Sequence, residues 1–404
     1  SLRHRREQGH GYTLEGDPPD VGGERFLFAC EALTGAPVSY GNELDVLING
    51  DRIFPALLEE LRGAERTIDL LTYVYWQGEI ADEVAAALCE RARAGVEVNV
   101  LLDWVGSARM ESRLLEEMER AGASVVKFRP LRPWTYRRLG NRTHRKVAVI
   151  DGRTGFIGGV GIADEWTGDA SDPDHWRDTH VRVRGPVVRS LQGAFAENWL
   201  EATGCVLAGP EHLPDLEPVD GGPPMQVVRS AAGVGDTDAE ALYFLALASA
   251  RESIELTAAY FSPRPAFRDA LREAAGRGVD VRLLVPGPHI DKEFVRVAGR
   301  RVYADLLDAG VRIFEYQRTM LHAKTLVVDG RWSSIGSVNF DNRSFQLNDE
   351  ATLCAQGEDV AGRLHEQFEE DLRESVEIDP ERWERRPPAH RARELVTALG
   401  RREI

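Results

Sequence analysis

The sequence reads H-R-K-V-A-V-I-D-G at residues 144–152, and the same pattern returns 178 residues later as H-A-K-T-L-V-V-D-G at residues 322–330. The apolar run between lysine and aspartate predicts a short buried β-strand. Successive side chains of a strand point to opposite faces, so a histidine and a lysine two positions apart share a face. The Asp-Gly pair predicts a tight hairpin turn after each strand. Two copies of one strand-and-hairpin unit indicate a duplicated chain.

The repeat extends upstream of both copies. Glu65–Leu70 resembles Arg251–Leu256, and Arg93–Val98 resembles Arg277–Val281. Each half alternates strands with helices before its hairpin, which predicts a mixed sheet covered on both faces. We therefore expect an α/β protein built from two homologous α/β/α domains with mixed sheets, related by a pseudo-two-fold axis.

Composition along the chain indicates where these domains begin and end. Residues 207–224 are rich in proline and glycine, as expected of a linker. The predicted organisation is an N-terminal arm (1–40), a first domain (41–206), the linker (207–224), a second domain (225–376) and a charged C-terminal tail (377–404). The arm shows no clear hydrophobic pattern.

The overall composition is that of a globular protein, with 43% hydrophobic and 29% charged residues among 404. The formal net charge of −16 works against nucleic-acid binding, which depends on neutralising phosphates. The four cysteines form no CxxC pair, which argues against a disulfide framework or a zinc site and fits a reducing, cytoplasmic compartment. The longest apolar stretch, Leu242–Ala250, is too short to span a bilayer. A membrane anchor upstream of Ser1 is left open.

Lysine is rare in this chain. The 50 basic residues include four lysines, which are Lys127, Lys146, Lys292 and Lys324. A lysine retained among so many arginines indicates a need for a compact, mobile point charge. Two of the four belong to the repeated motif.

The repeated histidine and lysine pairs suit phosphodiester chemistry. One imidazole can attack phosphorus to give a covalent intermediate, and a second can protonate the leaving alkoxide and deprotonate the incoming alcohol or water. Two lysines can hold the non-bridging phosphate oxygens. The residues required are His144, Lys146, His322 and Lys324, one pair from each half. We therefore expect a single site at the interface between the halves, which needs no metal ion or other cofactor.

The paired H-x-K-x-x-x-x-D motifs resemble the signature of the phospholipase D superfamily. The wider sequence, over residues 44–375, is similar to bacterial cardiolipin synthases. The segments that carry this similarity are Asn141–Lys146, Tyr260–Pro263, Val281–Gly287 and Gly336–Ser344. The resemblance implies that His144 is the nucleophile and His322 the acid and base, with Asp151 and Asp329 completing the two catalytic motifs.

The motif aspartates lie too far along the strand to orient their own histidines. Asp151 follows His144 by seven residues, which is about 23 Å of extended strand. We interpret Asp151 and Asp329 as turn residues that hold the hairpins, and expect other carboxylates to fix the imidazole tautomers. The superfamily pattern places Glu350 after the second motif, and Asp178 is the candidate after the first.

Residues beyond each hairpin are candidates for phosphate binding. They are Gly159 in the first half, and Ser337 and Asn339 in the second. The superfamily usually has asparagine at both positions equivalent to Asn339, but the first half has Gly161 there. We expect hydrogen bonds from this side of the first half to be absent or supplied by the backbone.

The segment from Lys127 to Lys146 is unusually basic, with eight lysines and arginines, no acidic residue and three aromatic rings. Each basic residue near an anionic bilayer contributes about 1 kcal/mol to binding, and aromatic side chains suit the membrane interface. The predicted lipid contacts are Arg129, Arg132, Trp134, Tyr136, Arg137 and Arg138. A solvated loop is the alternative interpretation.

Three classes of function fit these features. The first is phosphatidyl transfer to an alcohol through a phosphohistidine, with an anionic phospholipid such as phosphatidylglycerol as substrate, at a peripheral membrane surface. The second is a hydrolytic phosphodiesterase acting on lipid or nucleic acid, and the third is a membrane-binding module with an inert site. The intact double motif weighs against the third class, and the acidic net charge weighs against a nuclease. The resemblance favours the transferase, but the residues themselves do not decide between transfer and hydrolysis, and they leave the oligomeric state open.

Overall fold

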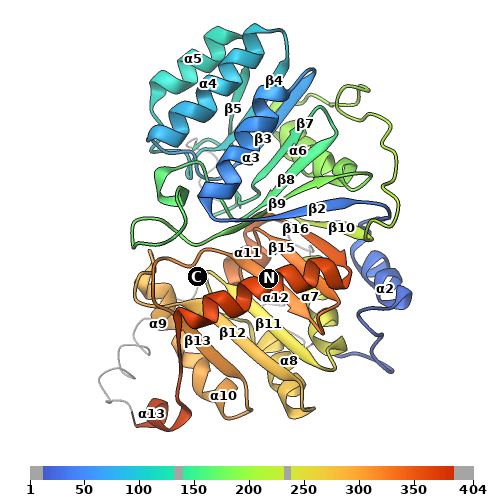
Figure 1. The fold of residues 1–404 in the computed structure, drawn as a ribbon, viewed down its shortest axis with the longest axis vertical. Helices are drawn as coiled ribbons and strands as arrows, with labels where there is room; N and C mark the ends of the chain where they lie inside the picture. Colours follow the sequence, from blue (N-terminus) through green and yellow to red (C-terminus); the bar gives the residue numbers. More distant parts are fainter. Residues whose placement is uncertain (1–11, 132–139, 232–237, 386–404) are drawn as a thin grey trace, which may run out of the picture.

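The computed structural model describes residues 12–131, 140–231 and 238–385, which form two mixed sheets, one in each half of the chain (Figure 1). The first sheet has the order β2 (Glu43–Ile48), β9 (Thr179–Arg184), β8 (Thr154–Gly158), β7 (Val147–Ile150), β3 (Thr67–Thr72), β4 (Glu97–Asp103), β5 (Ser124–Phe128). The second has the order β1 (Val38–Ser39), β10 (Met225–Ser230), β16 (Asn348–Gln356), β15 (Trp332–Gly336), β14 (Lys324–Val328), β11 (Ser253–Ala258), β12 (Asp280–Pro286), β13 (Arg312–Tyr316), β17 (Ser375–Glu377).

Seven strands of each sheet follow the same order and direction. In both halves the strands before the motif pair in parallel, and the motif strand pairs antiparallel with the first of them and with its hairpin partner. This correspondence confirms the predicted α/β fold of two homologous halves with mixed sheets. The boundaries of the predicted domains stay a prediction, although α6 ends at Thr203 and β10 begins at Met225, on either side of the expected linker.

Helices cover both faces of each sheet. The first half contains α3 (Gly50–Gly63), α4 (Glu79–Arg93), α5 (Ser112–Ala121), η2 (Asp164–Trp166) and α6 (Val188–Thr203). The second contains α7 (Asp238–Ser249), α8 (Pro265–Gly276), α9 (Glu293–Gly299), η3 (Arg300–Val302), α10 (Tyr303–Leu307), α11 (Asn342–Gln346), α12 (Glu358–Arg373) and α13 (Pro380–Glu384). Figure 1 shows α3, α4 and α5 on the side of the first sheet away from the second half, and α12 near the boundary between the halves.

The motif strands are apolar on both faces because each face lies in a different core. In β7, Ala148 and Ile150 pack beneath the outer helices, whereas Val147 and Val149 belong to a core shared with the second half. That shared core also contains Val327 of β14, together with residues of α6 and α12. Burial on both faces explains why the strand reads as a continuous apolar run. The same packing holds the two halves against each other.

The N-terminal arm contains a helix that the sequence pattern did not indicate. This helix, α2 (Glu24–Thr34), buries Phe26, Leu27 and Cys30 but leaves Phe28 and Leu33 exposed, which blurs the apolar stripe. The arm packs against the second half, because α2 contacts α7 and β1 pairs with β10. Strand β1 of the N-terminal arm therefore forms one edge of the second sheet.

Both hairpin turns use the motif aspartate and the glycine that follows it. Asp151 and Asp329 each have a φ of 53°, and the following glycines also have positive φ, as the two central residues of a type I′ turn do. Three residues separate the paired ends of each hairpin, because Ile150 pairs with Thr154 and Val328 with Trp332. The Asp151 carboxylate accepts hydrogen bonds from the backbone N–H groups of residues 65–67 at 2.7–3.2 Å. Asp329 binds residues 251–253 in the same way. Each aspartate thus links its hairpin by hydrogen bonds to the start of a neighbouring strand, β3 in the first sheet and β11 in the second, and not to a histidine.

We predict that Asp151→Ala and Asp329→Ala each lower the free energy of unfolding by about 2–3 kcal/mol, because a charged acceptor of several N–H groups is lost at a positive φ that alanine disfavours. The Asn variants should lose less, since asparagine tolerates this conformation and keeps one acceptor oxygen. Urea denaturation measures the change. The control is Asp215→Ala at a fully exposed carboxylate, and losses no larger than in this control would contradict the proposed role.

Candidate active site

The two motif histidines lie where the chain of one half crosses onto the other. β6 (Arg142–Thr143) pairs in parallel with the start of β16 in the second sheet. The backbone N–H of His144 then donates to the carbonyl of Asp349 at 2.8 Å. The second half repeats this arrangement, because Leu321 bridges to Arg177 and the N–H of His322 donates to the carbonyl of Arg177 at 2.7 Å. Each histidine backbone is therefore fixed to the opposite half.

The carboxylates that contact the imidazoles are also exchanged between the halves. His144 Nδ1 lies 3.0 Å from Glu350 Oε2, and His322 Nδ1 lies 2.7 Å from Asp178 Oδ2. With Nδ1–H donating to the carboxylate, each ring keeps an unprotonated Nε2 for reaction. The sequence pattern indicates both carboxylates but not the exchange, in which the carboxylate that follows one motif orients the histidine of the other.

Different neighbours hold the two carboxylates. Glu350 Oε2 accepts a hydrogen bond from the Ser337 hydroxyl. Asp178 accepts bonds from Trp166 Nε1 and from the backbone N–H of Thr179, both at 2.8 Å. Gly159 stands where the second half has Ser337, and a Cβ there would overlap the Asp178 carboxylate. The glycine therefore makes room for the carboxylate, whereas the serine binds its counterpart.

The motif lysines are buried beside the histidines. Lys146 Nζ donates to the carbonyl of His144 at 2.8 Å. Lys324 Nζ donates to the carbonyl of His322 and lies 2.9 and 3.1 Å from its two ring nitrogens. Both side chains are at most 5% exposed. The four predicted residues thus form two similar clusters at the boundary between the halves.

Burial controls the protonation of this centre. It lowers the pKa of His144 to about 4 and that of His322 to about 3, partly offset by the neighbouring carboxylates. It also lowers the pKa of Lys146 to about 7 and that of Lys324 to about 8. The charge of each lysine acts on both histidines, which places the two clusters within one electrostatic environment. At neutral pH the imidazoles are neutral and ready to act as nucleophile or base.

The pKa values of the two carboxylates shift the opposite way. Burial alone would raise the pKa of Asp178, but His322 and Lys324 hold it below its ordinary value. His144, Lys146 and the Ser337 hydroxyl do the same for Glu350. Both carboxylates are therefore ionised at neutral pH and can stabilise an imidazolium.

Aromatic rings that sequence analysis did not select line the histidines. Tyr73 packs edge-on against His144, with ring centroids 5.2 Å apart. Trp166 and Trp176 lie 5.2 and 5.5 Å from the His322 ring. These rings restrict imidazole rotation and exclude water from the faces they cover. The available signal was position, because Tyr73 follows the end of β3 and Trp176 precedes the carboxylate by two residues.

The missing asparagine of the first half has a steric explanation. A Cβ at Gly161 would lie 2.7 Å from the Val74 Cβ and 3.2 Å from the Trp166 ring. Val74, with the Trp166 ring close beside it, therefore leaves no room for a side chain there. In the second half Asn339 is buried, and its Oδ1 has no hydrogen-bond partner among the described residues. That acceptor is available to a hydroxyl group of a bound molecule.

The predicted lipid contacts are placed only in part. Arg129 does not face outward freely, because its guanidinium binds Glu201 at 2.7 Å and also contacts Asp349. These ion pairs link the end of β5 to α6 and to the second half, and the contact of Arg129 with lipid stays a prediction. The other five members of the set, from Arg132 to Arg138, lie outside the described residues.

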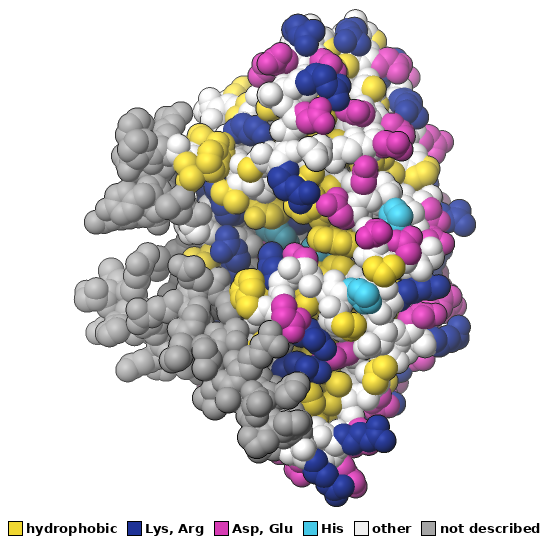
Figure 2. Space-filling view, turned by 90° about the vertical axis from the view of Figure 1, so that its left-hand side faces the viewer, with side chains coloured by type: hydrophobic (Ala, Val, Ile, Leu, Met, Phe, Trp, Pro, Cys, Tyr) yellow, Lys and Arg dark blue, Asp and Glu magenta, His cyan; other side chains and the backbone are white. Residues whose placement is uncertain are grey.

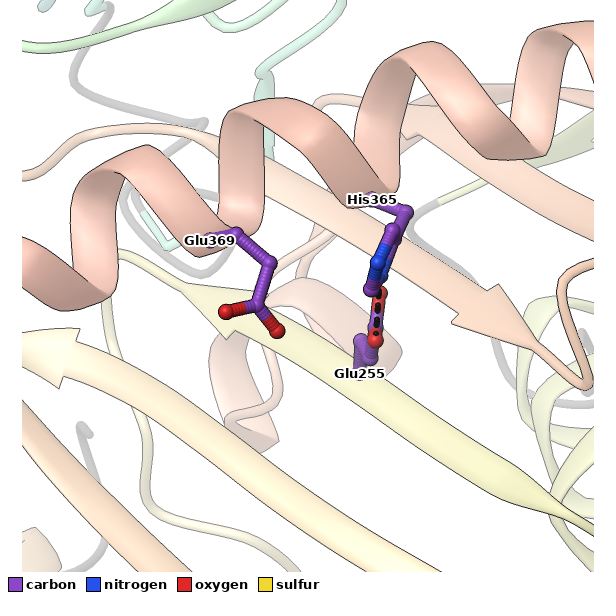
Figure 3. Close-up of side chains that lie close together, drawn as sticks. All are labelled: Glu255, His365 and Glu369. Carbon is purple, nitrogen blue, oxygen red and sulfur yellow. Dashed lines mark hydrogen bonds and ion pairs between the residues drawn. The ribbon is translucent and has the colours of Figure 1, made fainter.

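Away from this centre, one group of side chains in the described ranges has the spacing of metal ligands. Figure 3 shows Glu255 of β11 beneath His365 and Glu369 of α12, with His365 Nδ1 2.8 Å from Glu255 Oε1. Arg282 of β12 binds both carboxylates and supplies positive charge between them. Asp69, at the corresponding position of β3, is bound by amide and imidazole groups. We interpret the groups around Asp69 and Glu255 as networks around a buried carboxylate of each sheet. Both oxygens of Asp69 are bound, whereas in Glu255 Oε1 is bound and Oε2 has no partner among the described residues.

The chain matches a family model described as "Cardiolipin synthase, PLD-like domain" at residues 57–176 and 243–372. It is 39% identical over 366 residues to a cardiolipin synthase of Geobacillus sp. (strain WCH70), covering 90% of this chain and 73% of that protein. It is 38% identical over 368 residues to cardiolipin synthase 2 of Bacillus anthracis, covering 90% and 71%. Among solved structures, phosphatidylserine synthase of Haemophilus influenzae Rd KW20 shares the fold, with a TM-score of 0.74 at 12% identity over 94% of this chain and 100% of the other.

We predict that removing one carboxylate perturbs the histidine of the opposite motif. Glu350→Gln should disturb the Nδ1–H tautomer of His144 and leave His322 unchanged, and Asp178→Asn should do the reverse, since each loses one charge-assisted hydrogen bond. Imidazole ¹⁵N chemical shifts in histidine-labelled protein report the tautomers, with signals assigned from His144→Gln and His322→Gln. The opposite pattern, with each variant altering the histidine of its own half, would rule out the exchange.

Proposed function

Because this chain belongs to the cardiolipin synthase family of proteins with phospholipase D-like domains, we propose that it transfers the phosphatidyl group of phosphatidylglycerol to a hydroxyl group of a second phosphatidylglycerol. The chain is thus an enzyme of the phospholipase D superfamily. The observation that supports the proposal most strongly is the pair of exchanged carboxylate–histidine contacts, each beside a buried lysine. This centre provides a nucleophile, a proton carrier and two cations for one phosphodiester.

In the first half-reaction, His144 Nε2 attacks the donor phosphorus while the bond from phosphorus to the headgroup glycerol oxygen breaks. His322 Nε2 gives a proton to that oxygen, so that free glycerol departs and a phosphatidyl-histidine remains. The negative charge of the bound lipid, added to that of Asp178, favours the protonated form of His322 needed for this step. Lys146 and Lys324 bind the non-bridging oxygens and stabilise the charge that develops there.

In the second half-reaction, His322 Nε2 removes the proton of the acceptor hydroxyl. The acceptor oxygen then forms a bond to phosphorus, and the phosphorus–nitrogen bond to His144 breaks. The product is cardiolipin, and both imidazoles return to their starting state. Water in place of the lipid alcohol would give phosphatidic acid by the same steps, so the outcome depends on which acceptor occupies the site.

The reaction requires access to lipid, and we propose a peripheral position on an anionic membrane. Figure 2 shows that one face is hollowed between the two halves, where histidine and cationic side chains are visible. Across the ranges that the structure covers, no helix has the length and apolar character needed to cross a bilayer. Within the basic segment Arg129 is ion-paired and Lys146 belongs to the buried centre, so the charges that would attract anionic headgroups are those of Arg132, Arg137 and Arg138.

The test is product analysis with phosphatidylglycerol vesicles whose phosphorus is labelled. The wild type should release glycerol and form labelled cardiolipin, and quenching in alkaline denaturant should preserve label on His144 as an acid-labile, base-stable adduct. His144→Ala and His322→Ala should each reduce turnover by several orders of magnitude, and the double variant should lose little more, because residues that act as a unit are not additive. Phosphatidic acid as the main product would favour the hydrolase instead, and label on no histidine would exclude the intermediate.

The pKa values predict that kcat/KM falls more steeply as the pH rises above neutrality, because the lysines then lose their protons in addition to the His322 proton that the first half-reaction requires. The attacking imidazole must be unprotonated, and its pKa of about 4 allows this well below neutrality. The lysines must be protonated to bind phosphate, and with pKa values of about 7 and 8 they lose their protons as the pH rises through that window. Initial rates between pH 4.5 and 9.5 measure the profile. A rate that keeps rising to pH 9 would mean that the lysines are not required as cations.

A further inference from the structure

The two lysines outside the motifs have different surroundings. Lys127 is part-buried and donates to the Ser107 hydroxyl at 2.8 Å. Lys292 lies just before α9 with about half of its side chain exposed. Its Nζ is 4.6 Å from the centre of the Tyr260 ring and 3.9 Å from Asp291 Oδ2. Lys292 is therefore held loosely over an aromatic ring with its charge accessible.

Lys292 stands on the His322 side of the active site. The Tyr260 ring beneath it packs edge-on toward the His322 ring, with centroids 6.2 Å apart. Tyr260 is itself fixed, because its hydroxyl donates to the Asp291 carboxylate at 2.8–2.9 Å. The positive charge of Lys292 contributes to the lowered pKa values of both motif lysines. It thus lies close to the centre where phosphate reacts without belonging to it.

The first half has a counterpart at the corresponding position. Arg109 and Lys292 each follow the end of equivalent strands, β4 and β12, by six residues. The Arg109 guanidinium lies 4.0 Å above the Trp76 ring and 3.7 Å from Glu165. Between Trp76 and the second motif histidine stands a further indole, that of Trp166. Arg109 is therefore an exposed cation over an aromatic ring that is farther from the reacting groups, and it serves as a matched control.

An acceptor lipid brings a second negative charge to this side of the site. In the proposed reaction His322 deprotonates the acceptor hydroxyl, and in phosphatidylglycerol that hydroxyl is three carbon atoms from the lipid's own phosphodiester. This second phosphate does not react, but it must lose part of its hydration near the centre. Glycerol and water, as acceptors, carry no such group. A cation beside His322 would therefore act on the lipid acceptor alone.

We propose that Lys292, positioned by Asp291 and Tyr260, forms a second phosphate-binding site that holds the non-reacting phosphodiester of the acceptor lipid. Half-exposed ion pairs contribute little to stability, so Lys292 can exchange Asp291 for a phosphate oxygen at low cost. A compact ammonium on a flexible stem suits this movement better than a planar guanidinium. The inference rests on the proposed phosphatidyl transfer and names the group that favours a lipid acceptor over water.

The test compares two reactions of one enzyme on the same phosphatidylglycerol vesicles. Formation of cardiolipin uses the second phosphate, whereas exchange of the headgroup with labelled free glycerol does not. Lys292→Gln should lower the ratio of cardiolipin formed to glycerol exchanged by about tenfold, Lys292→Arg by less, and Arg109→Gln by less than twofold. Weaker vesicle binding would reduce both reactions together and leave the ratio unchanged. Cleavage of cardiolipin by added glycerol, the reverse reaction, should fall in parallel with its formation.

The outcomes separate this inference from the proposed function. A wild type that forms no cardiolipin would overturn the proposed function and this inference with it. Cardiolipin formation that is normal in the wild type, with an unchanged ratio in Lys292→Gln, would overturn the second phosphate site alone. An equal fall of the ratio in Arg109→Gln would assign the effect to general surface charge and would also overturn the site.

Discussion

The exchange of partners between the halves is the constraint on which the centre depends. His144 is bound through its ring to Glu350 and through its backbone to Asp349, and the second half mirrors both contacts onto Asp178 and Arg177. Neither half alone holds a complete histidine–carboxylate pair. Separation of the halves by even a small distance would leave buried ionised groups without partners, which is strongly destabilising. Assembly of the site and packing of the two sheets are therefore one event.

This arrangement keeps several ionisable groups in a nearly dry environment. Burial alone would neutralise the two carboxylates, but the facing histidines and lysines keep them charged. Burial also lowers the pKa of each lysine, so at neutral pH the site holds fewer positive charges than its composition suggests. The negative charge of a bound phosphodiester favours the protonated lysines, and substrate binding and activation of the site are thereby coupled.

Duplication explains the site, but the different roles of donor and acceptor in the proposed reaction favour halves that differ. Gly159 and Gly161 leave space for the Asp178 carboxylate and for Trp166, whereas the second half fills the equivalent positions with Ser337 and Asn339. Two indoles and the Tyr260 phenol pack around the second histidine, and the Tyr73 phenol packs against the first. The His322 side is thus shaped by rings and a nearby lysine, which suits the side where headgroups leave and enter.

The sequence alone determined the repeat, the mixed α/β architecture, the two histidine–lysine pairs and both tight turns. These features depend on local spacing: strand alternation, apolar runs and the positive φ that Asp-Gly accepts. Asp178 and Glu350 were also found, from their place after each motif. Which histidine each carboxylate contacts was decided only by tertiary structure, because it depends on how two faces of separate sheets meet across the shared valine-rich core.

The partners of Arg129 were also decided by tertiary structure. Its place in a basic segment did not indicate Glu201 and Asp349, since those residues are 72 and 220 positions away in the sequence. Helix α2 was not predicted, because its exposed Phe28 and Leu33 interrupt the apolar pattern of an amphipathic helix. Its buried face is defined only by packing on the second half.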